Sequence, residues 1–301
     1  MPWSFVVIEL VVCALVLALA FHAYREGPHW LSTLLWGIVF GTAIELILTA
    51  NAKPTAQHYV YGQFLVMIEI GRGRVPLWVG VGWGGIAYVS SWTAQRLGLP
   101  RTLHAAAAGI LAVSIDFSLD PVAELQKYWD WVNVSQLNFF GVPFDNFLGW
   151  FAIVGLYAWA ARQLFHWVPA RGHGKLGRAG SVLWVPAVAA VFATLVLRFV
   201  CAPLVEWGYS LISEVGVFCL VFGLAAVIVW YYALHARRNQ PTAWIVVALP
   251  LTMHLVSLGV VVLTGKYVDA VELLVFIPVT MVVSFLGFTW VSIDVLFPVR
   301  R

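Results

Sequence analysis

Two carboxylates four residues apart form the clearest chemical feature of the sequence. Asp116 and Asp120 lie near the end of an apolar run and, in a helix, would share one face. Two carboxylates at one depth repel each other unless one of them holds a proton. A carboxylic acid kept neutral by burial can deliver its proton to a substrate, so the spacing predicts a general acid. The alternative is structural: Pro121 is expected to bend the chain, and Asp120 would then cap backbone amides beyond the break.

Aromatic residues crowd the stretch that follows this acid pair. They are Trp129, Trp131, Phe139, Phe140, Phe144, Phe147 and Trp150. Aromatic faces stabilise a cation in a dry site, and they would equally line a groove for a polyene or prenyl chain. The structural alternative is an amphipathic surface helix with interfacial tryptophans. Gly141 and Pro143 predict a turn, after which Asn146 and Trp150, again four residues apart, open the next apolar helix.

Other ionisable residues also fall in apolar runs, where their burial is costly and makes them functional candidates. Glu45 lies deep in the second run and is the next candidate for a catalytic group. Glu9 and Asp294 lie near the ends of runs and are expected to reach water. Arg198 is expected to pair with an acid on another helix. Glu214 is the remaining ionisable residue in these apolar runs.

The composition is that of a membrane protein with many spans. Of the 301 residues, 62% are apolar and 10% are charged, whereas soluble domains carry about 25% charged residues. We predict an all-α, polytopic transmembrane bundle of about nine spans (eight to ten), forming a single integral membrane domain over residues 1–301. The predicted spans are about 3–22, 30–50, 75–95, 102–120, 143–165, 181–201, 210–235, 242–264 and 270–296.

The stretch 51–74 fits no span. Its apolar part, from Tyr59 to Ile70, is short and carries Gln63 and Glu69, so we predict a re-entrant or interfacial segment. If this segment crossed the membrane, there would be ten spans.

The distribution of positive charge predicts the orientation in the membrane. One side would hold Arg25, Arg96, Arg101, Arg162, Arg171, Lys175, Arg178, Arg237, Arg238, Arg300 and Arg301. The other would hold Lys53, Arg72, Arg74, Lys127 and Lys266. Because positive residues favour the cytoplasm, the C-terminus is expected to be cytoplasmic and the 121–142 loop to face outward or sit at the outer leaflet. The small net charge of +3 does not indicate a nucleic-acid partner.

Several classes of chemistry lack their motifs. The eight histidines show no clustered spacing, which argues against a membrane di-iron enzyme, and His104 and His254 are expected to be hydrogen-bonded structural residues. No phosphate-binding loop, nucleophile elbow, or flavin or nicotinamide motif is present. Gly80, Gly82 and Gly85 instead favour close helix packing. The three cysteines, Cys13, Cys201 and Cys219, are predicted to be small core residues. No cofactor and no metal are therefore expected.

The pattern of motifs resembles the carotenoid biosynthesis membrane protein family, which includes the carotenoid end-group hydratases. The resemblance is carried by Leu119–Ala123 (LDPVA), Trp129-x-Trp131 and Gly141–Trp150 (GVPFDNFLGW), with Tyr59-x-Tyr61, Val75–Leu77 and Trp83 upstream. It is best over residues 30–165, and residues 166–301 resemble the family only as C-terminal helical spans. Lys127 stands where the family usually has a small residue.

The resemblance implies addition of water to the terminal double bond of an acyclic carotenoid end group, giving a tertiary alcohol without a cofactor. Asp120 or Asp116 would be the acid, and Asn146 with the second carboxylate would hold the attacking water. Glu45 is the reserve acid. The substrate-binding residues would be Trp129, Trp131, Phe140, Phe147, Trp150, Tyr61 and Trp83.

Two alternatives remain open from the residues alone. One is a non-enzymatic isoprenoid-binding or transport protein that uses the same groove, and the other is isomerisation or cyclisation of an isoprenoid through the same cation. The expected partners are a carotenoid or other isoprenoid and membrane lipid, with other carotenoid-pathway enzymes as a further possibility. The expected location is the inner membrane of a bacterial or archaeal cell.

Overall fold

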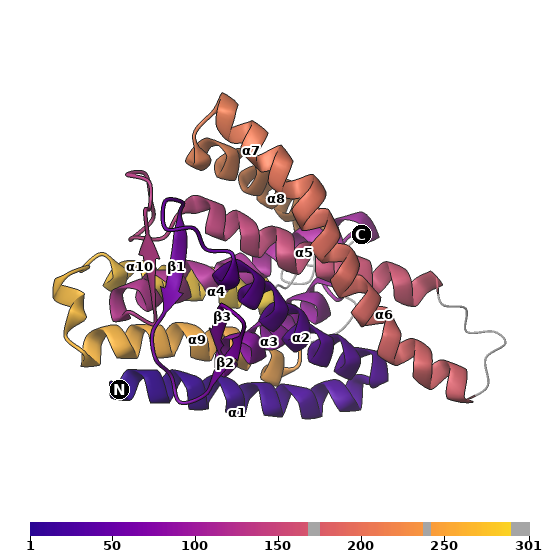
Figure 1. The fold of residues 1–301 in the computed structure, drawn as a ribbon. Coiled ribbons are helices and arrows are strands. Elements are labelled where there is room, and N and C mark those ends of the chain that lie inside the picture. The colour runs from indigo at the N-terminus through magenta and orange to yellow at the C-terminus, as the bar shows by residue number, and fades with distance from the viewer. Residues whose placement is uncertain (168–174, 237–241, 290–301) are drawn as a thin grey trace, which may run out of the picture.

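The computed structural model describes residues 1–167, 175–236 and 242–289. It is a helical bundle (Figure 1), which confirms the predicted all-α class. The helices are α1 (Trp3–Glu26), α2 (Pro28–Ala50), α3 (Leu77–Ala94), α4 (His104–Gln126), α5 (Phe144–Trp167), α6 (Lys175–Val196), α7 (Ala202–Leu211), α8 (Glu214–His235), α9 (Trp244–Leu263) and α10 (Leu273–Thr289). Asp294 and the basic residues Arg171, Arg237, Arg238, Arg300 and Arg301 lie outside the described residues.

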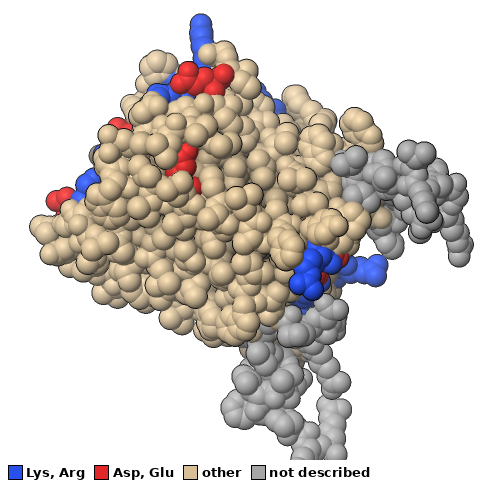
Figure 2. Space-filling view, turned by 90° about the horizontal axis from the view of Figure 1, so that it is seen from below, with Lys and Arg blue, Asp and Glu red and all other residues tan. Residues whose placement is uncertain are grey.

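All nine predicted spans contain helix, and six helical segments of the described chain are long and apolar enough to cross a bilayer. These six are α1, α2, Arg101–Gln126, Trp184–Leu211, α8 and α9, and α10 is a shorter apolar helix. Large apolar side chains on α6 to α8, such as Phe192, Trp207 and Trp230, are exposed. The face in Figure 2 is mostly uncharged, with acidic and basic atoms gathered toward its edges. A lipid environment accounts for such a surface.

The segment 51–74, predicted to be re-entrant or interfacial, does not span and contributes short strands instead. β1 (His58–Tyr61) pairs antiparallel with β4 (Trp129–Val132), and β2 (Met67–Ile70) pairs antiparallel with β3 (Gly73–Pro76). The surface-helix interpretation of the Trp129–Trp131 stretch is therefore wrong. The alternation of Tyr59-x-Tyr61 and Trp129-x-Trp131 is the period of a strand, in which residues two apart share a face.

Pro121 does not break its helix, contrary to the prediction. α4 continues through it to Gln126, so the first residues of the expected 121–142 loop are helical. Pro186, Pro250 and Pro278 likewise lie inside helices. A proline removes one backbone hydrogen bond, and inside a packed membrane bundle the neighbouring helices tolerate that loss. The helix instead ends at Lys127, which adopts a left-handed conformation (φ 62°). A small residue suits that position because side chains disfavour a left-handed backbone.

Two further expectations, those for Glu9 and Cys219, are wrong. Glu9 is buried, and its carboxylate accepts hydrogen bonds from the backbone amides of Leu65 (2.9 Å) and Val66 (3.1 Å), so it anchors the chain after β1. Arg198 is exposed in a π-helical turn between α6 and α7, and forms no ion pair with a described acid. The free cysteines are half-buried or, at Cys219, exposed, because a lipid-facing surface accepts apolar side chains as readily as a core does.

Gly80 and Gly84 bring α2 and α3 into close contact, which confirms the packing role predicted for Gly80, whereas Gly82 makes no such close approach. A Cβ on Gly80 would lie 2.0 Å from Thr42 Oγ1 on α2. A Cβ on Gly84 would lie 2.8 Å from both the Ile38 nitrogen and the Leu34 oxygen. Without a large hydrophobic driving force between helices in lipid, such close backbone approach supplies the packing energy. The contact matters for function because α2 and α3 carry two residues of the site described below.

We expect Gly84→Ala to lower the free energy of unfolding by about 1–3 kcal/mol, because the new methyl group overlaps backbone atoms of α2 that cannot move independently. Gly82→Ala is the matched control, since its Cβ would have its nearest neighbour at 3.6 Å. The measurement is unfolding of the purified protein by titration from a mild detergent into dodecyl sulfate. Equal midpoints for the two variants would contradict the close packing of α2 and α3.

Candidate active site at the acid pair and Glu45

The acid pair lies deep in the bundle, with an amide between its members. Asp116 is fully buried and Asp120 is 2% exposed, both on α4. From the first turn of α5, Asn146 Nδ2 donates to Asp116 Oδ2 at 3.2 Å and also to Asp120 Oδ2. The turn at Gly141 and Pro143 places Asn146 there, as predicted. Asp120 lies inside the helix, six residues before its last residue Gln126, so the capping alternative is wrong.

The geometry of the pair suits one shared proton. Asp116 and Asp120 are in hydrogen-bonding contact with each other. Ionised carboxylates are acceptors only, so that contact needs a proton on one of the two. Asp116 Oδ1 is buried and accepts no hydrogen bond from the described residues, which leaves it without the donors that a fully ionised group at this depth requires. The pair would therefore titrate as a unit.

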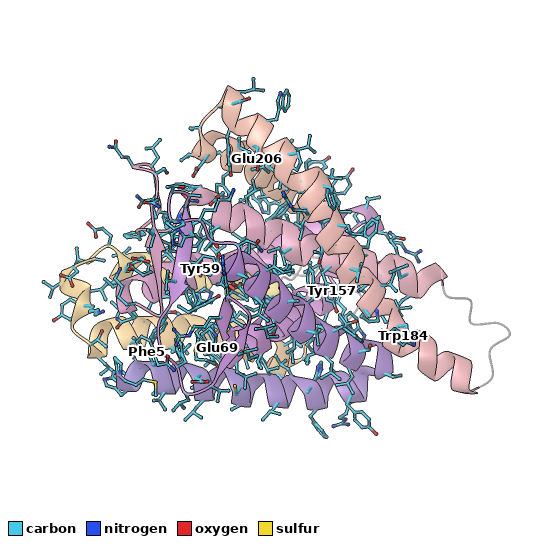
Figure 3. The ribbon with its side chains drawn as sticks, viewed as in Figure 1. Phe5, Tyr59, Glu69, Tyr157, Trp184 and Glu206 are labelled. Carbon is cyan, nitrogen blue, oxygen red and sulfur yellow. The ribbon has the colours of Figure 1, made fainter. Side chains whose placement is uncertain are left out.

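Glu45 lies on α2, 6% exposed, and accepts three hydrogen bonds. Tyr61 donates to Oε2 at 2.7 Å and Tyr59 (labelled in Figure 3) donates to the same oxygen, while Trp83 Nε1 on α3 donates to Oε1 at 2.9 Å. Burial and the nearby Glu45 raise the pKa of both tyrosines well above the ordinary value. Both phenols therefore stay neutral donors, and all three bonds stabilise the carboxylate form of Glu45.

Two stacked indoles link Glu45 to α5, the helix that carries Asn146. Trp83 stacks on Trp150 with ring centroids 4.3 Å apart and an interplanar angle of 28°, and Trp150 lies one turn after Asn146 on α5. Glu45 is close enough to Asp116 and Asp120 to interact with their charges. The predicted catalytic residues, which are far apart in the sequence, thus form one site. It holds three carboxyl groups, one amide and two indoles.

The pairing of β1 with β4 covers this site with four aromatic side chains. Tyr61 lies opposite Trp129 and Tyr59 lies opposite Trp131 in the strand register. The rings contact edge to face, with centroids 5.8 Å apart in the first pair and 4.8 Å in the second. Asp130, on the other face of the ribbon, is exposed. The strand register therefore places the predicted tryptophans against the two tyrosines that donate to Glu45.

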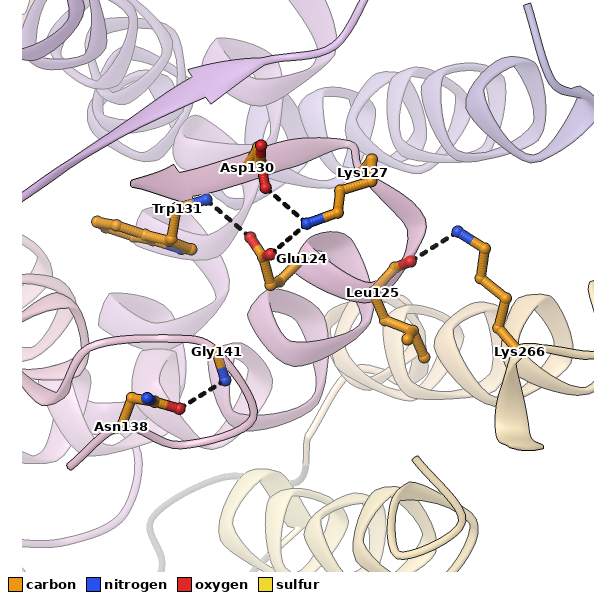
Figure 4. Close-up of polar contacts among 8 residues, drawn as sticks. All are labelled: Glu124, Leu125, Lys127, Asp130, Trp131, Asn138, Gly141 and Lys266. Carbon is orange, nitrogen blue, oxygen red and sulfur yellow. Dashed lines mark hydrogen bonds and ion pairs between the residues drawn. The ribbon is translucent and has the colours of Figure 1, made fainter. Parts of the chain in front are cut away.

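Glu124 holds this ribbon at the end of α4 (Figure 4). Its carboxylate accepts hydrogen bonds from the Trp131 backbone amide at 2.8 Å and from Lys127 Nζ at 2.6 Å. Lys127 Nζ also donates to Asp130 Oδ1 at 2.5 Å. The left-handed conformation of Lys127 forms the turn between α4 and β4. These hydrogen bonds hold that turn in place.

Gly141 lies against the same carboxylate and is needed there for two reasons. Its φ of 84° is one that side chains rarely adopt, and an added Cβ would lie 2.9 Å from Glu124 Cγ. Its backbone amide donates to Asn138 Oδ1 at 2.9 Å (Figure 4). The loop that leads into α5 is therefore set tightly against the end of α4, and this position determines where Asn146 meets the acid pair.

Phe140 and Phe147, predicted to bind substrate with the tryptophans, lie in a separate aromatic cluster. Phe147 packs on Phe117 of α4 with centroids 4.9 Å apart. Phe140 contacts Phe276 of α10 at 6.0 Å. The single aromatic groove expected from the sequence is thus divided by α4, because Phe117 projects from a different face of that helix than the two carboxylates. The other members of this phenylalanine cluster are Phe139, Phe144, Phe218 and Phe222.

Several of these residues carry no signal, or only a weak one, in the sequence. Tyr59 carried part of the resemblance, but its hydrogen bond to Glu45 was missed, although its spacing from Tyr61 by two was the available signal. Trp78, stacked on Trp129 at 6.0 Å, was also missed. Phe117 and Phe276 gave no signal, because an isolated phenylalanine in an apolar run is typical of any membrane helix.

His104 and His254 are hydrogen-bonded, as predicted. His104 Nε2 contacts the Leu99 carbonyl at 3.0 Å and Nδ1 contacts Arg162 at 2.5 Å. His254 Nδ1 contacts Ser118 Oγ at 2.5 Å. Among the described residues, no group of three or more His, Cys, Asp or Glu side chains is arranged to hold a metal ion.

Comparison with known proteins identifies the family. The family model described as carotenoid biosynthesis protein matches residues 5–217, which is most of the chain and includes the acid pair, Asn146 and Glu45. The chain therefore belongs to the carotenoid biosynthesis protein family and has a role in carotenoid biosynthesis. Together with the six long apolar helical segments found among the described residues, this makes it an integral membrane protein. No curated protein and no solved structure matched the chain significantly.

We expect Glu45→Gln to lower the free energy of unfolding by about 1–3 kcal/mol, because an amide NH₂ would face buried donors and leave one of them unpaired. Glu69→Gln is the matched control, since Glu69 is an exposed partner of Arg74, and such surface pairs contribute about 0–1 kcal/mol. Unfolding in dodecyl sulfate measures both variants. A Glu45→Gln protein as stable as the parent would contradict the three-donor arrangement.

Proposed function

We propose that the protein hydrates the terminal double bond of an acyclic carotenoid end group without a cofactor, giving a tertiary alcohol. The observation that carries this proposal is the buried pair Asp116 and Asp120, bridged by Asn146 and adjoining the stacked indoles of Trp83 and Trp150. An acid-catalysed hydration needs a proton donor, a site that tolerates a cation, and a water with a base. The residues of this site match each of these needs.

The first step would be proton transfer from the acid pair. The protonated member, Asp120 or Asp116, gives its proton to the less substituted carbon of the double bond as general acid. The electrons of the double bond form the new C–H bond, and a tertiary cation remains on the neighbouring carbon. The pair then carries one more negative charge, which is stabilised by the hydrogen bonds from Asn146 Nδ2.

The second step would be attack by water on this cation. A water held by the carbonyl oxygen of Asn146 adds its oxygen to the cationic carbon and loses a proton to the carboxylate pair. The product is a tertiary alcohol, and the acid is restored. The Nδ2 atom of Asn146 already contacts both carboxylates, so in this proposal the amide orients the pair as well as the water.

Glu45 and the indoles would stabilise the cation rather than transfer protons. Glu45 accepts three hydrogen bonds, and in this proposal it acts as a carboxylate, because a fixed negative charge in a dry site lowers the energy of a nearby cation. The faces of Trp83 and Trp150 add cation–π attraction. Trp129, Trp131 and Tyr61 would cover the end group, and the phenylalanine cluster with Phe140 and Phe147 would contact the polyene farther along.

Expression in cells that make an acyclic carotene should convert it to a product heavier by one water, measured by mass spectrometry of extracted pigments. Conversion should persist without oxygen and with a chelator in detergent extracts, since the proposed steps use only side chains. A changed pigment of unchanged mass would indicate isomerisation or cyclisation through the same cation. Unchanged carotene that co-purifies with the protein would indicate a binding or transport protein. Either outcome would contradict hydration.

Asp120→Asn should lower turnover by about 10²–10⁴-fold, because the amide is nearly isosteric with the acid but cannot deliver a proton. Asp116→Asn should also lower turnover and shift the pH optimum, since the two groups titrate together. The measurement is the rate of product formation by purified protein reconstituted with carotene, with bound carotene and folding checked in the same samples.

Asp130→Asn is the control for this pair, because Asp130 is exposed on the outer face of the β1–β4 ribbon and should lose little activity. If Asp120→Asn and Asp116→Asn both retained near-normal product formation, the acid would have to lie elsewhere. Glu45→Gln would then be the variant to assay for turnover.

A further inference from the structure

A pocket lies at the other end of the bundle from the acid pair. It has a volume of about 310 Å³, which falls in the range of about 300–1,000 Å³ of small-molecule sites. The pocket is lined by residues near the start of α2 and by residues near the end of α5. Glu45 and Asn146 lie at the opposite ends of these two helices. Thr33 lines this pocket and is twelve residues from Glu45, about 18 Å along the helix.

The charged groups that line this pocket are cationic. Arg101 precedes α4 and Arg162 lies in the last turns of α5, and the two guanidinium groups are close enough to repel one another. Neither forms an ion pair with an acid among the described residues. The carboxylate of Glu26 in this region is already engaged by Arg96 Nη2 at 2.6 Å and Trp92 Nε1 at 3.1 Å. Two arginines without a counter-ion favour an anionic ligand.

Polar groups in the same pocket add donors that an anion can use. Ser91 is 3% exposed and lines the pocket, and its hydroxyl has no hydrogen-bond partner among the described residues. A buried hydroxyl without a partner is costly, so it points to a missing acceptor. Gln95 and Gln163 also line the pocket and carry amide donors. The N-terminal end of α2, where His29 lies, adds the positive end of a helix dipole.

We propose that this pocket binds a phosphate-bearing ligand, with Arg101 and Arg162 contacting the phosphate oxygens and the Ser91 hydroxyl donating to one of them. Planar guanidinium groups match phosphate geometry with paired hydrogen bonds. The apolar remainder of the lining, with Trp30, Phe165 and Ala158, suits the carbon portion of such a ligand. Basic pockets between membrane helices bind anionic head groups. The ligand is therefore either a phospholipid head group or a free phosphate compound such as a diphosphate.

The test is calorimetric titration of the full-length protein, purified in a maltoside detergent, with two separate probes. One is sodium diphosphate, and the other is dihexanoylphosphatidylglycerol below its micelle concentration. At least one probe should bind saturably. Saturation by the lipid alone would identify a head-group site, and saturation by diphosphate would identify a site for free phosphate compounds. No saturable binding of either probe would overturn the proposal.

Arg162→Gln and Arg101→Gln should each weaken binding about tenfold or more, because each removes a charged hydrogen-bonding partner. Arg162→Lys keeps the charge and should weaken binding less. Ser91→Ala should weaken binding about fivefold and leave the fold unchanged, because its hydroxyl contacts no described group. Arg72→Gln, on the exposed β2–β3 turn at the far end, is the matched control. An equal loss in Arg72→Gln would overturn the proposal as non-specific charge binding. Because binding is measured without turnover, this result is independent of whether the protein hydrates carotene.

Discussion

Burying carboxyl groups in an apolar bundle is the constraint on which the site depends. An isolated ionised carboxylate is too costly in such surroundings, so it must be protonated, hydrogen-bonded or paired. Each buried acid of this protein meets that requirement differently. Glu45 accepts from two phenols and an indole, Glu9 accepts from two backbone amides, and Asp116 and Asp120 contact each other and share Asn146. Among the buried acids of the described residues, the acid pair combines contact between carboxyl groups with an oxygen that lacks a donor.

The fold supplies these partners through tight junctions at one end of the bundle. Glycines let α2 and α3 approach closely, which brings Trp83 to Glu45. The left-handed residue Lys127 reverses the chain after α4, and Glu124 fixes the following strand through the Trp131 amide. Pairing of β4 with β1 then brings Tyr59 and Tyr61 over the same carboxylate. The strands are short, yet they decide which aromatic side chains surround the site.

The two ends of the molecule differ in chemistry. Carboxyl groups, phenols and indoles lie together at the end with the acid pair. The pocket at the opposite end is lined by Arg101 and Arg162, and no acid among the described residues forms an ion pair with either arginine. An amphiphilic protein in a bilayer experiences different surroundings at each leaflet, and a basic pocket is suited to the leaflet where anionic head groups gather. The proposed hydration and the proposed phosphate site are thus separated along the helices and rest on different side chains.

The sequence by itself determined the membrane class, the helical spans and the acid pair. Apolar runs of span length leave few other folds, and a spacing of four places Asp116 and Asp120 on one helix face wherever that helix packs. Tertiary structure decided the rest. Pro121 continues its helix because the packed neighbours tolerate one lost hydrogen bond, which local preference cannot foresee. Tyr59 meets Glu45, and Phe140 separates from Trp150, because strand register and helix rotation depend on contacts between segments far apart in the chain.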